Sequence, residues 1–241
     1  MTDTPIDLRH SGPVTLFIGA GMSAESGVPT YRGQGGIWGQ YDYHEVACQA
    51  AFERQPAAVL DFHETRRQAV LACSPHVGHR HIAALQTAHP GQLRVVTQNI
   101  DGMLQRAGVR VDAELHGSLW RARCTAHGVT PDADAGPYRH RRCPRCGEWM
   151  RPDITWFEDV VDEAVFARAG ALIFDSEWLI AIGTSAVVYP AASFLPAARA
   201  RGVRLAEINP APSDLPGFDR RLALPASTGL PQLLQGGVTS A

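Results

Sequence analysis

Two pairs of residues in the chain have the spacing of metal ligands. Two residues separate Cys124 from His127, two separate Cys143 from Cys146, and fifteen lie between the pairs. Two such pairs, each on its own turn, close the tetrahedral site of a structural zinc ion, which takes no part in catalysis. A histidine stands where a second thiol is typical, so two alternatives stay open: His140 replaces His127, or no tight zinc site remains.

A glycine-rich segment has the composition of a phosphate-binding turn. Residues 19–24, GAGMSA, match the spacing G-x-G-x-x-G/A at the end of the apolar run VTLFIGA at 14–20. The glycines allow a tight turn and a close approach of the backbone to a pyrophosphate, and the following helix supplies free N–H groups. An ordinary turn between a strand and a helix also fits this spacing.

The segment after this turn argues against hydride transfer. A dehydrogenase continues into a second strand that ends in an acidic residue, which binds the ribose. This chain instead enters a loop at 31–55 that carries Tyr31, Arg32 and Trp38. Such a loop suits an enzyme that binds a dinucleotide and closes over it.

Polar side chains follow three further apolar runs at the points where these runs end. The segments are TQNID at 97–101, GTS at 183–185 and EINP at 207–210. The carboxyl ends of strands in an α/β sheet bind the ligand, so these groups and the glycine-rich turn would converge on one crevice. Each segment alone could also be a helix cap.

His116 ends the segment VDAEL at 111–115 and is the candidate general base. An imidazole with an unperturbed pKa of about 6.5 accepts a proton near neutral pH. A lone histidine is more commonly structural, so this assignment depends on the crevice.

A predicted helix at 56–72 has one face made of Val59, His63, Arg66 and Val70. Arg66 has no acidic residue three or four positions away, whereas Arg67 has Glu64. A cation on an apolar face needs an anion from elsewhere. Arg66 is therefore a candidate for binding an anionic ligand, with an ion pair to a distant acid as the alternative.

The elements that position these groups are short apolar runs separated by helical patterns. Strands are predicted at 14–20, 93–99, 111–115, 178–184 and 203–209, and helices at 56–72, 76–88, 161–175 and 190–201. This alternation indicates an α/β fold with a Rossmann-like, doubly wound parallel sheet. Residues 120–152 break the rhythm with clustered Cys, His, Arg and Pro and no strand-like core, which indicates a small inserted module.

The composition limits the classes of function. Apolar residues make up 45% of the 241 residues, the net charge is -2 and the pI is about 6.5, so neither nucleic acid nor a membrane surface is an expected partner. The polar N-terminus and the absence of long apolar runs favour the cytoplasm, where the five cysteines would be thiols or metal ligands. The oligomeric state stays open, with a monomer as the simplest case.

Several segments, taken in order, resemble the sirtuins, which are NAD-dependent protein lysine deacylases. They are GAGMSAESGVPTYR, TQNID, ELHGSL, the CxxH and CxxC pairs, RPDITWF and GTSAVVYPAA, within a resemblance that covers residues 14 to about 226. The resemblance implies a Rossmann-type NAD-binding domain at 1–30, 74–119 and 153–241. It also implies a smaller lobe, with a loop and helical part at 31–73 and a zinc-binding module at 120–152.

The resemblance also assigns sites to residues of this chain. The residues expected to bind NAD are Gly19, Ala20, Gly21, Ser23, Ala24, Tyr31, Arg32, Trp38, Gln98, Asn99, Ile100, Asp101, Gly183, Thr184, Ser185, Asn209 and Ala226. Asp101 would bind the nicotinamide carboxamide. Ile154, Trp156 and Phe157, with Thr155, would pair with the substrate peptide as an added strand.

In the implied reaction NAD is a co-substrate and is consumed. The acyl oxygen of an acyl-lysine attacks the ribose carbon that carries nicotinamide, and nicotinamide leaves. His116 takes a proton through the ribose hydroxyls, and water finally releases free lysine and an O-acyl-ADP-ribose. The expected substrates are acyl-lysine proteins or peptides.

The choice of acyl group depends on two residues of the helix predicted at 56–72. Sirtuins that remove succinyl or malonyl groups carry Tyr-x-x-Arg at this helix, and here Arg66 matches while His63 replaces the tyrosine. His63 could donate to an acyl carboxylate, more strongly when protonated at lower pH, or could admit a different chain. Tyr31 also replaces a phenylalanine, and FED at 157–159 replaces Phe-Gly-Glu, a loss of glycine that would stiffen the loop.

Two other functions fit part of the pattern. A mono-ADP-ribosyltransferase would use the same NAD site, and a non-catalytic NAD-sensing zinc protein would need no base. The intact TQNID and ELHG segments favour a deacylase over both. Nicotinamide release only in the presence of an acyl-peptide would distinguish the three.

Overall fold

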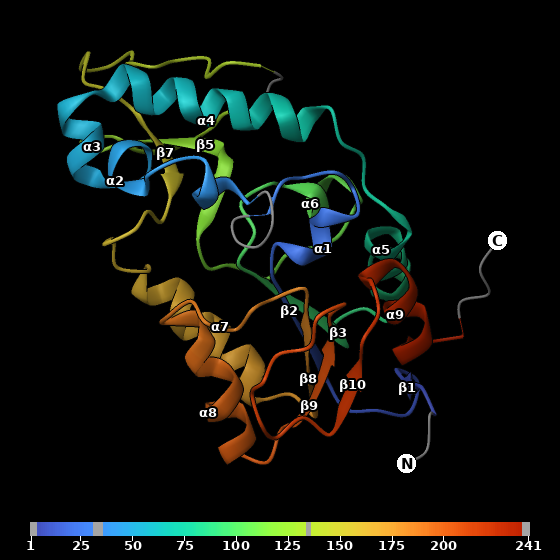
Figure 1. Ribbon diagram of the computed structural model, residues 1–241. Helices are drawn as coiled ribbons and strands as arrows, with labels where there is room; N and C mark the ends of the chain where they lie inside the picture. The colour runs from blue at the N-terminus through green and yellow to red at the C-terminus, as the bar shows by residue number, and fades with distance from the viewer. Residues whose placement is uncertain (1–3, 31–35, 134–135, 238–241) are drawn as a thin grey trace.

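The computed structural model describes residues 4–30, 36–133 and 136–237, which form two lobes (Figure 1). The strands of the larger lobe are β2 (Val14–Ile18), β3 (Leu93–Thr97), β4 (Ala113–Glu114), β8 (Trp178–Ile182), β9 (Arg204–Ile208) and β10 (Arg220–Leu222). They form one parallel sheet in the order β10-β9-β8-β2-β3-β4. The five strands expected from apolar runs are confirmed. β10 was not predicted, because two of its three residues are arginines and it therefore forms no apolar run.

The strand order explains where a ligand site must lie. The chain winds from β2 toward β3 and β4 on one side, and the later strands β8, β9 and β10 extend the sheet on the other. The carboxyl ends of β2 and β8 therefore flank a topological switch point, where doubly wound sheets bind their ligands. Every residue of these two strands is buried, as expected of central strands covered on both faces.

Helices cover both faces of the sheet. α5 (Val77–Ala88) and α9 (Ala226–Leu233) lie on one face, and α7 (Glu163–Phe174) and α8 (Phe194–Ala200) on the other (Figure 1). Side chains of β2 alternate between the two cores: Leu16 packs in the α5 and α9 core, and Phe17 in the α7 and α8 core. The helices predicted in these regions are confirmed.

The smaller lobe joins helices to a second sheet. It contains α2 (Tyr43–Val46), α3 (Gln49–Arg54), α4 (Pro56–Leu71), β5 (Gly117–Cys124), β6 (Gly128–Pro131) and β7 (Arg151–Ile154). The three strands pair antiparallel in the order β6-β5-β7. Residues 120–152, which show no strand-like core in the sequence, therefore supply strands to this sheet. Leu119, Ala122 and Cys124 of β5 pack in the core of this lobe, and ion pairs from Asp153 of β7 to Arg121 (2.7 Å) and Arg123 (2.5 Å) also join the two strands.

The remaining elements are short. They are β1 (Ile6–Asp7), which pairs with β11 (Leu234–Gln235), the one-turn helices α1 (Gly21–Ala24) and α6 (Met103–Arg106), and the 3-10 turns η1 (Ile37–Gly39) and η2 (Ala191–Ser193). Across the described ranges, no helix combines the length and the apolar character needed to cross a membrane.

Candidate active site

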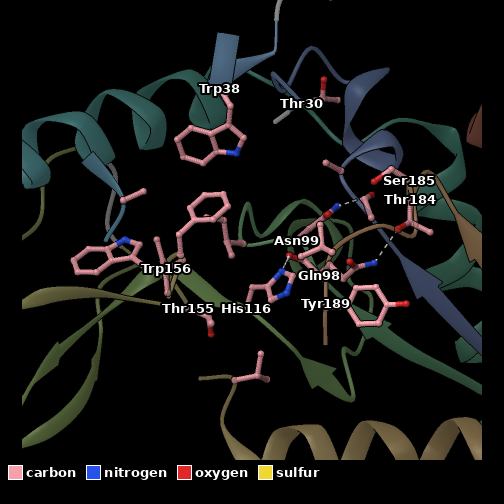
Figure 2. Close-up of a pocket in the computed structure, with 18 of the residues that line it drawn as sticks. Thr30, Trp38, Gln98, Asn99, His116, Thr155, Trp156, Thr184, Ser185 and Tyr189 are labelled. Atoms are coloured by element: carbon pink, nitrogen blue, oxygen red, sulfur yellow. Dashed lines mark hydrogen bonds between the residues drawn. The ribbon is translucent and has the colours of Figure 1, made fainter. Parts of the chain in front are cut away.

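A cavity of about 540 Å³ opens where the carboxyl ends of β2, β3 and β8 face the smaller lobe (Figure 2). The residues from the sequence prediction that line it are Gly19, Ala20, Gly21, Trp38, His63, Arg66, Gln98, Asn99, Ile100, His116, Ile154, Thr155, Trp156, Phe157, Gly183, Thr184, Ser185 and Asn209. Segments far apart in the chain thus meet in one space of the size that small-molecule sites occupy.

Three glycines allow the ends of β2 and β8 to touch backbone to backbone. A Cβ atom on Gly183, whose φ is +56°, would lie 2.4 Å from the Met22 nitrogen, and one on Gly19 would lie 2.7 Å from the Gly183 oxygen. The Gly21 N–H donates to that same oxygen (2.8 Å). These positions therefore need glycine for packing within the chain, besides any approach of a phosphate.

The helix after the glycine turn differs from the expectation. α1 is a single turn, and the N–H groups of Met22 and Ser23 donate to the carbonyls of Gly19 and Ala20. The N–H groups of Met22 and Ser23, expected to be free for a pyrophosphate, are thus already bonded within the turn.

Side chains at the strand ends form a network across the sheet. The Gln98 amide donates to Thr184 Oγ1 (3.1 Å), which connects the ends of β3 and β8, and the Asn99 amide donates to the Gly19 carbonyl (3.0 Å) (Figure 2). Asn209 Nδ2 donates to the Thr184 carbonyl (3.2 Å). The network holds these polar groups in fixed positions along one edge of the cavity.

His116 lies at the centre of this edge. Its Nδ1 bonds to the carbonyl oxygen of Gln98 at 3.0 Å, so Nδ1 carries the proton and Nε2 keeps its lone pair (Figure 2). Burial lowers the pKa of His116 below 6.5, and the bond to Gln98 opposes that shift only in part. The ring is therefore neutral at pH 7 and equipped to accept a proton at Nε2.

Four of the predicted NAD-binding residues lie outside the lining of the cavity. Ser23 and Asp101 are buried behind it, where Asp101 Oδ1 accepts the Met103 N–H (2.8 Å) and so caps α6. Burial raises the pKa of the Asp101 carboxyl, against the bonds that it accepts. Ala24 is exposed and Ala226 begins α9. Tyr31 and Arg32 fall outside the described residues.

His63 and Arg66 border the cavity from α4. Trp156 Nε1 donates to His63 Nε2 (3.1 Å), so the proton of this neutral ring is on Nδ1. Burial, followed by the charges of Arg66 and Arg151, lowers the pKa of His63 to about 3. The expectation that His63 gains a proton at moderately acid pH is therefore wrong. Only its Nδ1–H remains as a donor.

Arg67 also differs from its predicted role. It is fully buried, and its guanidinium bonds to Asp132 Oδ1 (2.9 Å) and to three backbone carbonyls, not to Glu64. Glu64 instead pairs with Arg141. An ion pair between neighbouring turns of a helix was the simplest expectation, and the fold of the module replaced it with pairs across the lobe.

The segment expected to pair with a peptide uses its own amides. The N–H groups of Thr155 and Phe157 donate to the carbonyls of His116 (3.0 Å) and Ala47 (3.1 Å), and the Trp156 N–H donates to Asp159 (3.0 Å). These N–H groups already donate within the protein, so they are not available to pair with the backbone of a peptide.

The cavity lining also includes residues that the sequence reasoning missed. They are Thr30, Ala47, Glu158, Asp159, Val161, Val188, Tyr189, Pro190 and Ala211. Tyr189 and Trp156 lie on opposite sides of His116 (Figure 2). The signal for part of this set was present, since residues 188–190 continue the GTSAVVYPAA segment and Glu158 lies within FED.

Cys124, His127, Cys143 and Cys146 form one cluster in the smaller lobe, with their ligand atoms within 4.8 Å of one another. His127 Nδ1 lies 3.6 Å from the Cys124 sulfur and 3.4 Å from that of Cys143. Bond lengths of ~2.0–2.3 Å to zinc give tetrahedral edges of roughly 3.5–3.8 Å, so these donors fit that ion. His127, not His140, completes the cluster. The zinc site is structural, because four protein ligands leave no open position.

Comparison with known proteins gives a uniform result. A family model described as the Sir2 family matches residues 19–190. The chain is 41% identical over 235 residues to NAD-dependent protein deacylase 2 of Pyrobaculum aerophilum, which covers 95% of this chain and 92% of the relative. Among solved structures, a mutant Sir2 homologue with ADP-ribose superposes with a TM-score of 0.86 at 34% identity, covering 92% and 90% of the two chains. A Sir2 homologue with NAD gives 0.83 at 35%, covering 92% and 88%.

Proposed function

The chain belongs to the Sir2 family, and from this premise we infer that it is an NAD-dependent protein lysine deacylase. NAD fits the larger lobe, because the cavity lies at the switch point of a Rossmann-type sheet and is edged by hydroxyl and amide groups. When bound, NAD supplies the nicotinamide–ribose bond that breaks, so that nicotinamide, an O-acyl-ADP-ribose and free lysine are the products.

The observation that carries this proposal is the state of His116. Its tautomer is fixed by the Gln98 carbonyl, its ring is neutral at pH 7, and it lines the cavity. A base of this kind removes a proton from a ribose hydroxyl in the same cavity, through Nε2. Gln98, Asn99, Thr184 and Asn209 would hold the sugar and nicotinamide beside it.

The substrate peptide would bind at the mouth of the cavity between two loops. Neither the N–H nor the C=O of Glu158 bonds to another described residue, and the N–H groups of Val187 and Tyr189 are equally unpaired in that part of the chain. Exposed backbone groups of this kind bind an extended peptide by main-chain hydrogen bonds. The peptide therefore pairs beyond Phe157, and Ile154, Trp156 and Phe157 form the wall of the acyl-lysine tunnel.

Arg66 would bind the far end of the acyl group. It lines the cavity from α4, and a guanidinium there matches the carboxylate of a succinyl or malonyl chain. His63 remains neutral and stands in place of the tyrosine, but its Nδ1 is buried, so Arg66 makes the contact to the carboxylate. Acetyl-lysine, which lacks the carboxylate, would bind without this contact.

The cysteines of the zinc cluster must stay reduced to bind the metal, which supports a cytoplasmic location. The decisive experiment incubates the purified protein with NAD and a panel of acetyl-, malonyl-, succinyl- and longer acyl-lysine peptides, read by mass spectrometry. A deacylase releases nicotinamide only when an acyl-peptide is present. An ADP-ribosyltransferase would add mass to a protein, and an NAD sensor would release no nicotinamide. Either result overturns the proposal.

A further inference from the structure

Glu158 has a backbone conformation that is unusual for its residue type. Its φ is +72°, and among the described residues only Ala186 shares a positive φ without being glycine. Glu158 is the third residue of a tight turn that the Asp159 N–H closes on the Trp156 carbonyl (3.2 Å). Glycine is the usual residue at this position of such a turn. Strain of this kind is typical of functional loops.

The turn is held by its neighbours and not by the Glu158 side chain. Asp159 accepts the Trp156 N–H and pairs with Arg151 (2.6 Å), whose guanidinium lies 3.7 Å from the centre of the Trp156 ring. The Glu158 carboxylate makes no hydrogen bond or ion pair with any described residue. Glu158 thus has a strained backbone, and its carboxylate has no partner among the described residues.

The surroundings of Glu158 define what its charge would meet. It is exposed and borders the same cavity as Val188 and Tyr189 of the opposite loop. The charge of Asp159 is already balanced by Arg151, and residues 186–190 carry no charge. Tyr189 is 74% exposed and offers an aromatic face. A cation at this mouth would find a carboxylate on one loop and a ring on the other.

We propose that Glu158 selects acyl-lysine peptides that carry a cationic side chain next to the acylated residue. This inference rests on the proposed deacylase function and adds a preference of sequence to it. The contact is exposed to solvent, so it should act through KM and give about a three- to fivefold preference at low salt, which screening by salt reduces.

The test uses one acyl-peptide with glutamine at the two positions on either side of the acyl-lysine. Arginine or glutamate then replaces one glutamine at a time, and nicotinamide release gives kcat/KM. The readout is the ratio between arginine and glutamine peptides for wild type, E158Q and E163Q, because a ratio cancels any general loss of activity. Glu163 is the matched control: it is also exposed and lies five residues on, but outside the cavity lining.

In wild type, arginine at one or more positions should raise kcat/KM about three- to fivefold over glutamine, and glutamate should lower it. E158Q should bring the ratio to about one, whereas E163Q should leave it as in wild type. A ratio of one in wild type, or a ratio that E158Q does not change, overturns the proposal. If no peptide releases nicotinamide, the deacylase function itself is wrong, which is a distinct result.

Discussion

Two neighbouring arginines on α4 have opposite environments. Arg66 lines the cavity, whereas Arg67 is fully buried between α4 and the zinc module. They are adjacent in sequence, so their side chains leave the helix about 100° apart, which sends one toward the ligand and the other into the lobe. Removing the charge of Arg66 should therefore change the choice of substrate. Removing the charge of Arg67 should lower the stability of the fold.

Arg66→Met should reduce activity selectively. Loss of the guanidinium removes a charge-assisted contact to a succinyl carboxylate, which should lower kcat/KM for succinyl-lysine by roughly 10- to 100-fold. Acetyl-lysine should change much less, since it offers no carboxylate. Arg168→Met, on an exposed face of α7, is the control and should alter neither. Equal losses on both substrates would contradict the role given to Arg66.

The pH profile should report His116. Its active form is neutral, and burial lowers the pKa of its ring below 6.5, so kcat/KM should be constant between pH 7 and 8. Activity should then fall on the acid side, with a midpoint under pH 6.5, as the ring gains its proton. His116→Ala should abolish turnover while NAD still binds, which calorimetry can measure. An acid limb centred above pH 7 would exclude this assignment.

At the scale of elements, α4 connects the cavity wall to the zinc module. Arg67 reaches from this helix to the carbonyls of Leu119 (3.0 Å) and Gly136 (3.1 Å), and to Asp132 through both its carboxylate and its carbonyl. Its guanidinium also lies between the rings of Trp120 and Tyr138. One side chain thus satisfies groups from several segments that have no regular pairing with α4.

Arg67→Met should destabilise the protein strongly. It leaves the Asp132 carboxylate buried without its partner, which costs about 3–5 kcal/mol of unfolding free energy. Arg94→Met is the control, because Arg94 pairs with the exposed Asp175 and should cost no more than ~1 kcal/mol. Urea denaturation measures both. A loss under ~1 kcal/mol at Arg67 would show that the buried pair contributes little.

The elements also show what could be predicted from sequence. The five central strands have continuous apolar runs such as WLIAI, so periodicity and composition identified them and the switch point followed. β5 near the zinc cluster buries Leu119, Ala122 and Cys124 at irregular spacing across a register shift, so no regular alternation of apolar residues marked it as a strand. The cavity residues at strand ends were predictable because topology brings those ends together.

Other features of the site depend on contacts that no local pattern encodes. Arg67 pairs with an acid sixty-five positions away, and the tautomer of His63 depends on Trp156, ninety-three positions away. The residues at the mouth of the cavity were not predicted from sequence for a different reason. Tyr189, for example, lines the cavity from a loop and is 74% exposed, and sequence alone does not distinguish an exposed aromatic residue from a buried one.

The whole molecule has a composition that matters for an enzyme acting on acyl-lysine. All 22 lysine-or-arginine positions are arginines, so this sequence contains no lysine amine. Chemical acyl donors such as acetyl-CoA react with unprotonated amines, and a guanidinium with a pKa above about 12 stays protonated. The chain therefore offers no acyl-lysine of its own to compete for the cavity.

Incubation with acetyl-CoA should accordingly modify a lysine-containing substrate protein but leave this enzyme active. Peptide mapping should find no acyl-lysine on this chain, and any acyl groups should lie on the α-amino group or on cysteine thiols. A lysine-containing protein of similar size in the same tube is the control. Loss of activity in step with acyl adducts on this chain would contradict the expectation.

The contact between the glycine turns of β2 and β8 limits which residues can be replaced during evolution. The obstacle to a side chain at Gly19, Gly21 or Gly183 is backbone, which no compensating change of a neighbouring side chain removes. The three glycines therefore have to be conserved together in evolution, although more than 160 residues separate the first two from the third. Any descendant that keeps this crevice has to keep all three together, and one that loses a single glycine must rebuild both turns.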